Sequence, residues 1–351
     1  MNRLFFWIMI LIFTLVLVAA VVALIDLLLW LAFRKVADPQ AIHRLWWAVD
    51  IALVLAIAGV MAYGHWVTRF EIDVNRVEVK NSKVPAAFDG FRIVHISDFH
   101  IDSFDKGDDD AFMDRLNDTI ASLHPDMICF TGDLVTMESA QAEPWVEKLK
   151  AFATRLEQSA APGDTPPALY AIMGNHDYAD YPREFTPRQR IEDREKLHHI
   201  IYNAGWKLLD NCHVTIHRGG DSILLAGVGN IGEPPFTSYG NLKRALRTPA
   251  GDSILTDDPD AETYKVLLSH NPRHWRQEVL ENGIDLMLAG HTHAMQVRVG
   301  TWSPVQYRYP EWGGLYSEGA QQLYVNTGIG CTGWRVRIGV PPEVTLITLK
   351  R

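Results

Sequence analysis

Residues 92–100 read RIVHISDFH, a strand-like run followed by an aspartate and a histidine. Its first six residues, which include Ile93, Val94 and Ile96, read as a β-strand, and Asp98 and His100 follow directly. In an extended chain, side chains two positions apart point the same way, so this carboxylate and imidazole can share a cation. The triplet alone is weak evidence, because a loop aspartate that caps the next helix gives the same pattern.

Four later segments place similar residues after further apolar runs. They are Gly132-Asp133, Gly174-Asn175-His176-Asp177, Ser269-His270-Asn271 and Gly290-His291-Thr292-His293. Taken singly, Asp133 also fits a turn or a helix N-cap, and His270 fits a buried core histidine. Segment 174–177 is more specific, because turn chemistry explains its Gly, Asn and Asp but not its His. Together the segments predict a two-metal site on strand-end loops, which is typical of phosphate ester hydrolysis.

Strands and helices alternate from residue 92 onward, which predicts a sheet with helices outside it. Strands are expected at 92–97, 126–131 and 168–173, with helices at about 108–123, 143–157 and 187–204. The second half is richer in strands, expected near 206–210, 213–217, 222–228, 264–269, 285–289, 296–299, 321–326 and 343–349, with a helix near 273–282. We therefore expect an α/β fold, a four-layer αββα sandwich of two mixed sheets that begins with an edge strand within 68–80.

The first 67 residues have a different character. Residues 4–25 form a run without charged side chains that is long enough to cross a bilayer. The alternative interpretation is a cleaved signal peptide, but the run is too long for the apolar core of one. A second apolar stretch, about 45–67, has aromatic residues at both margins and no polar face over 51–64, which favours a membrane helix over a buried amphipathic one. We expect a two-helix transmembrane hairpin over 1–67 and a catalytic domain over 68–351. The short connection keeps the active site near the membrane and favours an amphiphilic substrate.

Basic residues give a narrow prediction of orientation. The loop between the apolar stretches holds Arg34, Lys35 and Arg44, and the outer flanks hold Arg3, Arg69, Arg76, Lys80 and Lys83. The positive-inside rule then favours both termini and the catalytic domain in the cytoplasm.

Charge and cysteine content exclude other classes of protein. The net charge is −9 and no basic cluster is visible, which argues against a nucleic-acid partner. Cys129, Cys212 and Cys331 are far apart and odd in number, so they predict neither a disulfide framework nor a thiolate zinc site. No obligate protein partner is evident.

The ordered motifs resemble the calcineurin-like metallophosphoesterase superfamily over about residues 69–350. The two-helix anchor, the wording GNHDY and the closing segments 326–330 and 341–345 resemble its membrane-associated YaeI/YkuE-type branch. That branch is similar to enzymes that hydrolyse UDP-2,3-diacylglucosamine in lipid A synthesis. The resemblance implies a membrane-anchored phosphodiesterase or pyrophosphatase with two divalent metal ions, and the mixed nitrogen and oxygen ligands suit Mn, Fe or Zn.

The resemblance also implies roles for single residues. One metal would be held by Asp98, His100 and His293, the other by Asn175, His270 and His291, with Asp133 bridging. His176 would face the phosphate and stabilise charge or protonate the leaving oxygen, and we expect Asp177 to orient its ring. Two departures from the branch bear on substrate choice: Ala294-Met295 stand where glycines are frequent, and Thr327 stands where a basic residue is common.

Two questions stay open at this point. Residues 302–316 are rich in aromatics (Trp302, Tyr307, Tyr309, Trp312 and Tyr316), which either pack internally or form a wall against a base, sugar or acyl chain. The alternatives to a lipid-linked substrate are a phosphodiesterase or phosphatase of some small substrate and a non-catalytic, metal-stabilised membrane scaffold.

Overall fold

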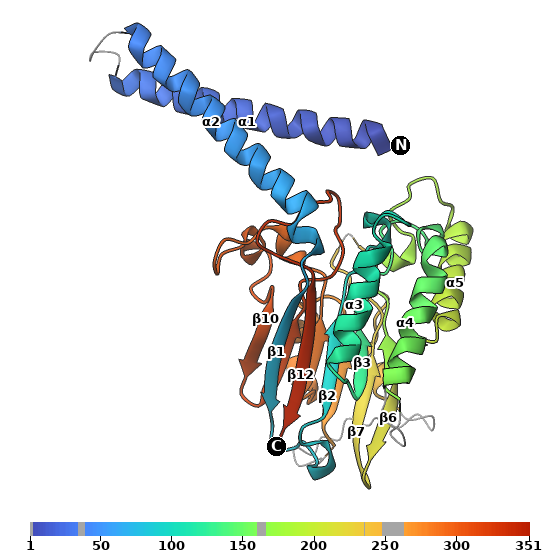
Figure 1. Cartoon of the computed structure of the whole chain (residues 1–351). Coiled ribbons are helices and arrows are strands. Elements are labelled where there is room, and N and C mark those ends of the chain that lie inside the picture. The colour runs from blue at the N-terminus through green and yellow to red at the C-terminus, as the bar shows by residue number, and fades with distance from the viewer. Residues whose placement is uncertain (1–2, 34–38, 160–165, 235, 248–262) are drawn as a thin grey trace. The chain divides into compact units, whose positions relative to one another are not determined.

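The computed structural model of the chain describes residues 3–33, 39–159, 166–234, 236–247 and 263–351 (Figure 1). The chain divides into two compact units, residues 1–67 and 68–351. Arg34 and Lys35, which entered the prediction of orientation, lie outside the described residues.

The described residues of the first unit form two helices, α1 (Arg3–Phe33) and α2 (Pro39–Trp66). Within the described part of the chain, one helical segment, residues 44–70, is long and apolar enough to cross a membrane, with a mean hydropathy of 2.1. A shorter apolar helix covers residues 18–33. Both predicted helices are therefore present, and the two-pass hairpin stays a prediction.

The second unit contains two six-stranded sheets, in the orders β1-β12-β2-β3-β4-β5 and β10-β11-β9-β8-β7-β6. Both sheets combine parallel and antiparallel neighbours, as predicted. The strands of the first are β1 (Asp73–Lys80), β2 (Arg92–Ile96), β3 (Met127–Phe130), β4 (Ala168–Ala171), β5 (Lys207–Leu208) and β12 (Glu343–Lys350). Those of the second are β6 (Cys212–Arg218), β7 (Asp221–Gly227), β8 (Lys265–Leu268), β9 (Leu286–Ala289), β10 (Gly314–Glu318) and β11 (Gln321–Val325).

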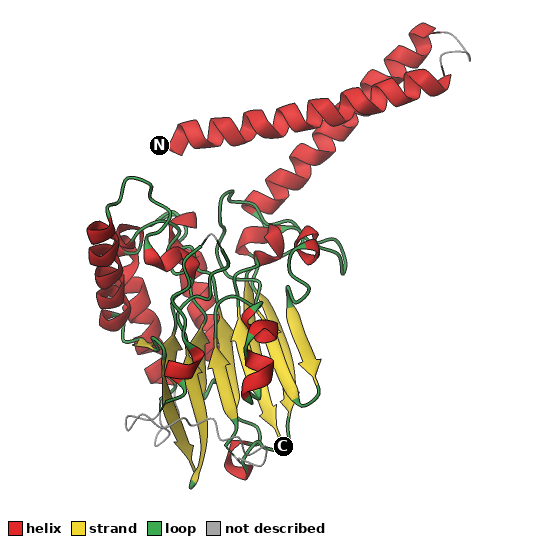
Figure 2. Cartoon of the chain, turned by 180° about the vertical axis from the view of Figure 1, so that it is seen from behind, coloured by secondary structure: helices red, strands yellow, loops and turns green. Residues whose placement is uncertain are grey.

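Helices cover the outer face of each sheet (Figure 2). They are α3 (Asp110–Ser122), α4 (Val146–Ser159) and α5 (Pro187–Asn203) on the first sheet, and α6 (Leu242–Ala245) and α7 (His274–Gln277) on the second. Neighbouring strand residues point to opposite faces, so Val94 packs against α3 to α5 while Ile93 enters the core between the sheets. Leu225 joins that middle core, and Leu224 packs against α6 and α7. The result is the expected four-layer arrangement.

Some predicted elements are wrong in detail. Residues 296–299 form no strand, because the backbone turns through the short 3-10 helix η8 (His293–Gln296), whose last three residues all have positive φ. Strand β10 was not predicted, and it pairs antiparallel with β11 at the edge of the second sheet. The helix expected near 273–282 is divided into α7 and the 3-10 helix η7 (Val279–Asn282).

The strand ends bring the predicted motifs to one end of the sandwich. In the first sheet, Ile96 pairs with Phe130, and Phe130 with Ala171, so the parallel strands β2, β3 and β4 end side by side. Ligand-binding loops in α/β folds follow the carboxyl ends of such strands. Nδ1 of His270 lies 2.7 Å from the carbonyl oxygen of Thr131, which joins the loop after β8 to the loop after β3. Loops of both sheets therefore meet at this end.

Candidate metal centre

Five of the seven predicted metal ligands have a left-handed backbone conformation. Their φ angles are 52° for Asp98, 37° for His100, 59° for Asp133, 74° for His291 and 49° for His293. A non-glycine residue in this region costs on the order of 1–3 kcal/mol, and such strain clusters at functional sites. Backbone hydrogen bonds hold the turns, among them Asp98 N to the Gly132 carbonyl and His100 N to the Asp133 carbonyl.

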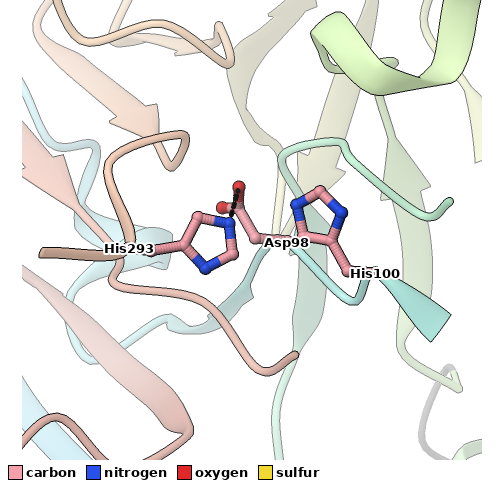
Figure 3. Close-up of side chains that lie close together, drawn as sticks. All are labelled: Asp98, His100 and His293. Atoms are coloured by element: carbon pink, nitrogen blue, oxygen red, sulfur yellow. Dashed lines mark ion pairs between the residues drawn. The ribbon is translucent and has the colours of Figure 1, made fainter. Parts of the chain in front are cut away.

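The first donor group is Asp98, His100 and His293, all buried. Figure 3 shows the Asp98 carboxylate between the two imidazole rings. Nε2 of His293 lies 3.1 Å from Oδ1 of Asp98, and the centroids of the two rings are 4.9 Å apart. One carboxylate oxygen and two ring nitrogens therefore lie within 4.8 Å of one another, close enough to share one ion.

The second donor group is Asp133, His270 and His291, with Asn175 beside them. Oδ1 of Asn175 lies 2.7 Å from Nδ1 of His291 and 3.1 Å from Nε2 of His270. The two histidine nitrogens are 3.2 Å apart. Nitrogen and oxygen donors of this kind, without thiolate, suit first-row divalent cations.

Asp133 lies between the two groups. Its Oδ2 is 3.5 Å from Nε2 of His100 and 3.1 Å from Nε2 of His270. The same side chain accepts a hydrogen bond from the backbone N–H of His176 through Oδ1, at 2.8 Å. One carboxylate oxygen thus faces donors of both groups, as a bridging ligand must.

Outer hydrogen bonds fix which ring nitrogens face the centre. Nδ1 of His100 pairs with Oγ1 of Thr136 at 3.0 Å, and Nδ1 of His270 pairs with the Thr131 carbonyl. Metal-binding histidines are usually oriented in this way. Nε2 of His100 and Nε2 of His293 are buried and make no hydrogen bond within the described residues. Such orphaned nitrogens beside two carboxylates fit a bound cation.

Burial and neighbouring charges shift the pKa values of the donor residues. Burial lowers the pKa of His270, but Asp133 outweighs burial and raises it to about 9. Burial lowers the pKa of His291 to about 3, and the neighbouring His270 adds to this effect. Burial alone would raise the pKa of Asp98, but His293 and His270 hold it below its ordinary value. The carboxylates of Asp98 and Asp133 thus stay ionised and His291 stays neutral, whereas His270 holds a proton that a cation would displace on binding.

His176 lies at the centre, but the predicted role of Asp177 is wrong. Nδ1 of His176 pairs with the Thr136 carbonyl at 2.7 Å, and its ring stacks on Tyr181 with centroids 4.3 Å apart. The Asp177 carboxylate instead accepts backbone hydrogen bonds from four residues, Asp133, Leu134, Val135 and Gly174. The two residues are neighbours in one turn of 3-10 helix, η6 (Asn175–Tyr178), where adjacent side chains do not face each other. Asp177 therefore braces the loop that carries Asp133.

Three residues at the centre were not predicted as partners of the ligands. Thr136 contacts His100 with its hydroxyl and His176 with its carbonyl. The hydroxyl of Tyr309 lies 2.8 Å from Nε2 of His291, so this one aromatic of segment 302–316 supports a candidate ligand. Arg337 is fully buried, donates to carbonyl groups of its own loop and brings Nη2 to 3.5 Å from Nδ1 of His293. No local sequence pattern marks Thr136 or Arg337.

Comparison with known proteins agrees with the predicted superfamily. A family model described as calcineurin-like phosphoesterase matches residues 91–295, more than half of the 351 residues. The metallophosphoesterase YkuE of Bacillus subtilis is 27% identical over 336 residues, which cover 90% of this chain and 99% of that protein. The UDP-2,3-diacylglucosamine pyrophosphatase LpxG of Chlamydia trachomatis is 28% identical over 357 residues, which cover 85% of this chain and 96% of LpxG.

A vertebrate relative is also similar. The protein of Danio rerio named transmembrane protein with metallophosphoesterase domain is 28% identical over 308 residues, which cover 85% of this chain and 62% of the fish protein. The family match spans all the donor residues from Asp98 to His293. The chain therefore belongs to the calcineurin-like phosphoesterase family and is a metal-dependent phosphohydrolase.

Proposed function

We propose that this protein is a membrane-anchored, dinuclear-metal phosphohydrolase that cleaves the pyrophosphate bond of a lipid-linked substrate of the UDP-2,3-diacylglucosamine kind. The observation that carries the proposal is the pair of donor groups that meet at Asp133. The similarity to LpxG over 85% of this chain supports the choice of substrate.

The metal ligands follow from the two groups. Asp98, His100 and His293 would hold one ion, Asn175, His270 and His291 would hold the other, and Asp133 would be shared by both. When bound, two such cations supply positive charge to the phosphoryl oxygens and lower the pKa of an attacking water. Manganese, iron and zinc all suit these ligands. Elemental analysis of protein purified without added metal identifies the native ions.

His176 is the residue proposed to act on the leaving oxygen. Its Nδ1 is taken by the Thr136 carbonyl, so Nε2 is the nitrogen available to the substrate. Stabilising or protonating that oxygen requires the imidazolium form. Burial opposes this form and lowers the pKa of His176, while the Asp133 carboxylate favours it. A bound phosphate anion adds negative charge and shifts the balance toward the imidazolium.

Replacement of His176 tests this role. His176→Ala is expected to lower kcat by about 10²- to 10⁴-fold, the usual worth of a general acid, while both metals stay bound. His199→Ala, on the exposed face of α5, is the matched control. Unchanged turnover of His176→Ala at full metal content would show that the assigned role is wrong.

A substrate panel in detergent tests the reaction. We expect the Mn²⁺-loaded protein to hydrolyse UDP-2,3-diacylglucosamine faster than a glycerophosphodiester or bis-p-nitrophenyl phosphate, and Asp133→Asn to hydrolyse none of them. Preference for the water-soluble esters would favour a phosphodiesterase of small substrates. Absence of hydrolysis across the panel would favour a metal-stabilised scaffold.

The location belongs to the same proposal. Residues 1–67 would cross the membrane twice and residues 68–351 would form the catalytic domain on the cytoplasmic side. The apolar helix over 44–70 and the transmembrane relative support this arrangement. In vesicle-embedded Cys212→Ser protein, cysteines placed singly at Tyr202 and at Ala37 should then react with membrane-impermeant thiol reagents from opposite sides.

A further inference from the structure

Four large apolar side chains are exposed on the segment that follows the candidate ligand His293. Met295, Val299, Trp302 and Tyr307 expose 54%, 67%, 42% and 80% of their surface, and we call this set the apolar rim. They all follow the candidate ligand His293 within fourteen positions of the chain. A cluster of exposed large apolar residues on one short segment marks an interaction surface.

Two polar side chains of the segment that carries the rim lie inside, while Thr301 is exposed and Arg298 and Gln306 are half-buried. Gln296 and Ser303 are 1% and 0% exposed. Gln296 donates to the carbonyls of Trp334 and Val336, and Ser303 donates to the carbonyl of Ala294. Val305 is buried and adds an apolar anchor. The apolar side chains therefore point outward from a segment that is fixed by hydrogen bonds, which reverses the usual preference of these residues.

The rim lies at the end of the domain where the chain enters it. Asp73, at the start of β1, pairs with Glu343, and Thr345 pairs with His95 of β2. Because β1 is parallel to β12 and β12 is antiparallel to β2, β1 begins where β2 ends and where Asp98 follows. In the sequence, the apolar helical segment over residues 44–70 directly precedes β1.

Side-chain contacts connect this first part of the domain to the rim. Arg69 donates to the carbonyl of Ser103 at 3.1 Å, and the Ser103 hydroxyl accepts from the backbone N–H of Cys331, also at 3.1 Å. The next residue, Thr332, donates its N–H to Oε1 of Gln296 at 2.7 Å. The loop 331–338 thus lies between the start of the domain and the segment that carries the rim.

We infer that the apolar rim is a membrane-contact surface that inserts into the interface of the bilayer. Trp302 and Tyr307 are residue types that favour the headgroup region, and Val299 and Met295 suit the acyl boundary beneath it. The inference rests on the proposed function and deepens it: the metal centre next to the rim receives the phosphate of a lipid whose chains stay in the bilayer.

Fluorescent labels on the full-length protein in vesicles test the inference. Cys212, the exposed cysteine, is replaced by serine, while Cys129 and Cys331 are buried. An environment-sensitive fluorophore is attached at Val299→Cys and, separately, at Tyr307→Cys. Tyr202→Cys on α5 is the matched control, because Tyr202 is 77% exposed, against 80% for Tyr307. The vesicles contain phosphatidylcholine with or without a doxyl quencher on the acyl chain.

We expect blue-shifted emission and strong doxyl quenching at positions 299 and 307, and neither at 202. Quenching at 299 and 307 no greater than at 202 would overturn the inference. A blue shift without lipid quenching that grows with protein concentration would also overturn it, in favour of contact with a second copy.

Hydrolysis of UDP-2,3-diacylglucosamine by the unlabelled Cys212→Ser protein, which carries no change in the rim, separates the two proposals. Hydrolysis without lipid quenching would overturn the inferred membrane contact and leave the proposed substrate standing. Lipid quenching without hydrolysis would overturn the proposal about the substrate and leave the inferred membrane contact standing.

Discussion

The hydroxyl oxygen of Tyr309 lies 2.8 Å from Nε2 of His291, opposite the ring nitrogen that faces Asn175. A neutral imidazole carries one N–H, so an N–H at Nε2 that donates to Tyr309 leaves the lone pair of Nδ1 for the metal. Tyr309 also lies near Arg273, whose guanidinium carbon is 5.0 Å from the centroid of the tyrosine ring. The tyrosine therefore holds the ring of a candidate ligand in an orientation that turns Nδ1 toward the centre.

Removing that hydroxyl should weaken metal binding without removing a ligand. We expect Tyr309→Phe to lower metal affinity by about 10- to 100-fold, the usual effect of losing an outer hydrogen bond to a ligating histidine. Chelator competition on the detergent-solubilised protein measures the affinity. Tyr202→Phe, which alters an exposed tyrosine on α5, should have no effect. Equal affinities for the two variants would contradict the role of Tyr309.

Asp177 should matter for stability more than for chemistry. Its carboxylate accepts four backbone N–H groups, and burial together with Asp133 raises its pKa to about 7 against the effect of these donors. An asparagine offers one acceptor oxygen, so Asp177→Asn should leave buried donors unsatisfied and cost about 2–4 kcal/mol. Thermal unfolding measures the loss.

The control for this variant is Asp180→Asn. Asp180 accepts from the Tyr239 hydroxyl at 2.8 Å and is less buried, so its replacement should cost about 1 kcal/mol or less. If Asp177→Asn kept its melting temperature and lost only activity, the bracing role would be refuted and an orienting role restored.

The candidate ligands were predictable because they are local to strand ends. A buried run such as 127–130 fixes its own strand, and the residues that follow must then emerge at the edge of the sheet. The alternation of strands and helices likewise limited the fold to helices outside paired sheets.

The partners of the ligands were not predictable, because they come from distant parts of the chain. Tyr309 reaches His291 across 18 positions and Arg337 reaches His293 across 44. The loss of the strand expected at 296–299 has a similar cause. Ala294, Met295 and Gln296 adopt positive φ in succession. Tertiary contacts impose this conformation, and no glycine stands at these positions to predict it.

The close approach of two strand-end loops gives a third prediction. Gly132 has φ of 97°, and a Cβ placed there would lie 2.3 Å from the backbone N of Gly174. Gly107 has the same φ of 97° and nothing within 4 Å of such a Cβ. We expect Gly107→Ala to cost about 1–2 kcal/mol from backbone strain alone. Gly132→Ala should cost about 1–3 kcal/mol more, because the loops that carry Asp133 and Asn175 must separate.

Thermal unfolding and metal content distinguish the two glycine variants. Gly107→Ala should keep both metals, whereas Gly132→Ala should lose affinity for them as well as stability. Equal losses of stability in the two variants would mean that backbone conformation, and not the contact between the loops, sets the requirement for glycine at 132.

His95 should make folding sensitive to acid. Its ring is fully buried between the sheets, where Nε2 pairs with Oγ1 of Thr131 at 2.9 Å, and burial lowers its pKa from 6.5 to about 4 despite Glu343 and Asp98. Between pH 6.5 and about 4, His95 therefore binds a proton in the unfolded chain but not in the folded chain. The contribution of the neutral His95 ring to the free energy of unfolding, about 3 kcal/mol in total, is complete above pH 6.5 and is lost as the pH falls toward 4.

A variant that cannot titrate isolates this contribution from the other groups that gain protons in acid. His95→Gln keeps a side chain able to reach Thr131 and removes the proton-binding site. The melting temperature of the native protein should therefore fall more steeply than that of His95→Gln between pH 6.5 and 4, while the two curves run parallel above pH 6.5. Curves that stay parallel throughout would mean that His95 takes up its proton equally in the folded and unfolded states, and that burial does not keep the ring neutral.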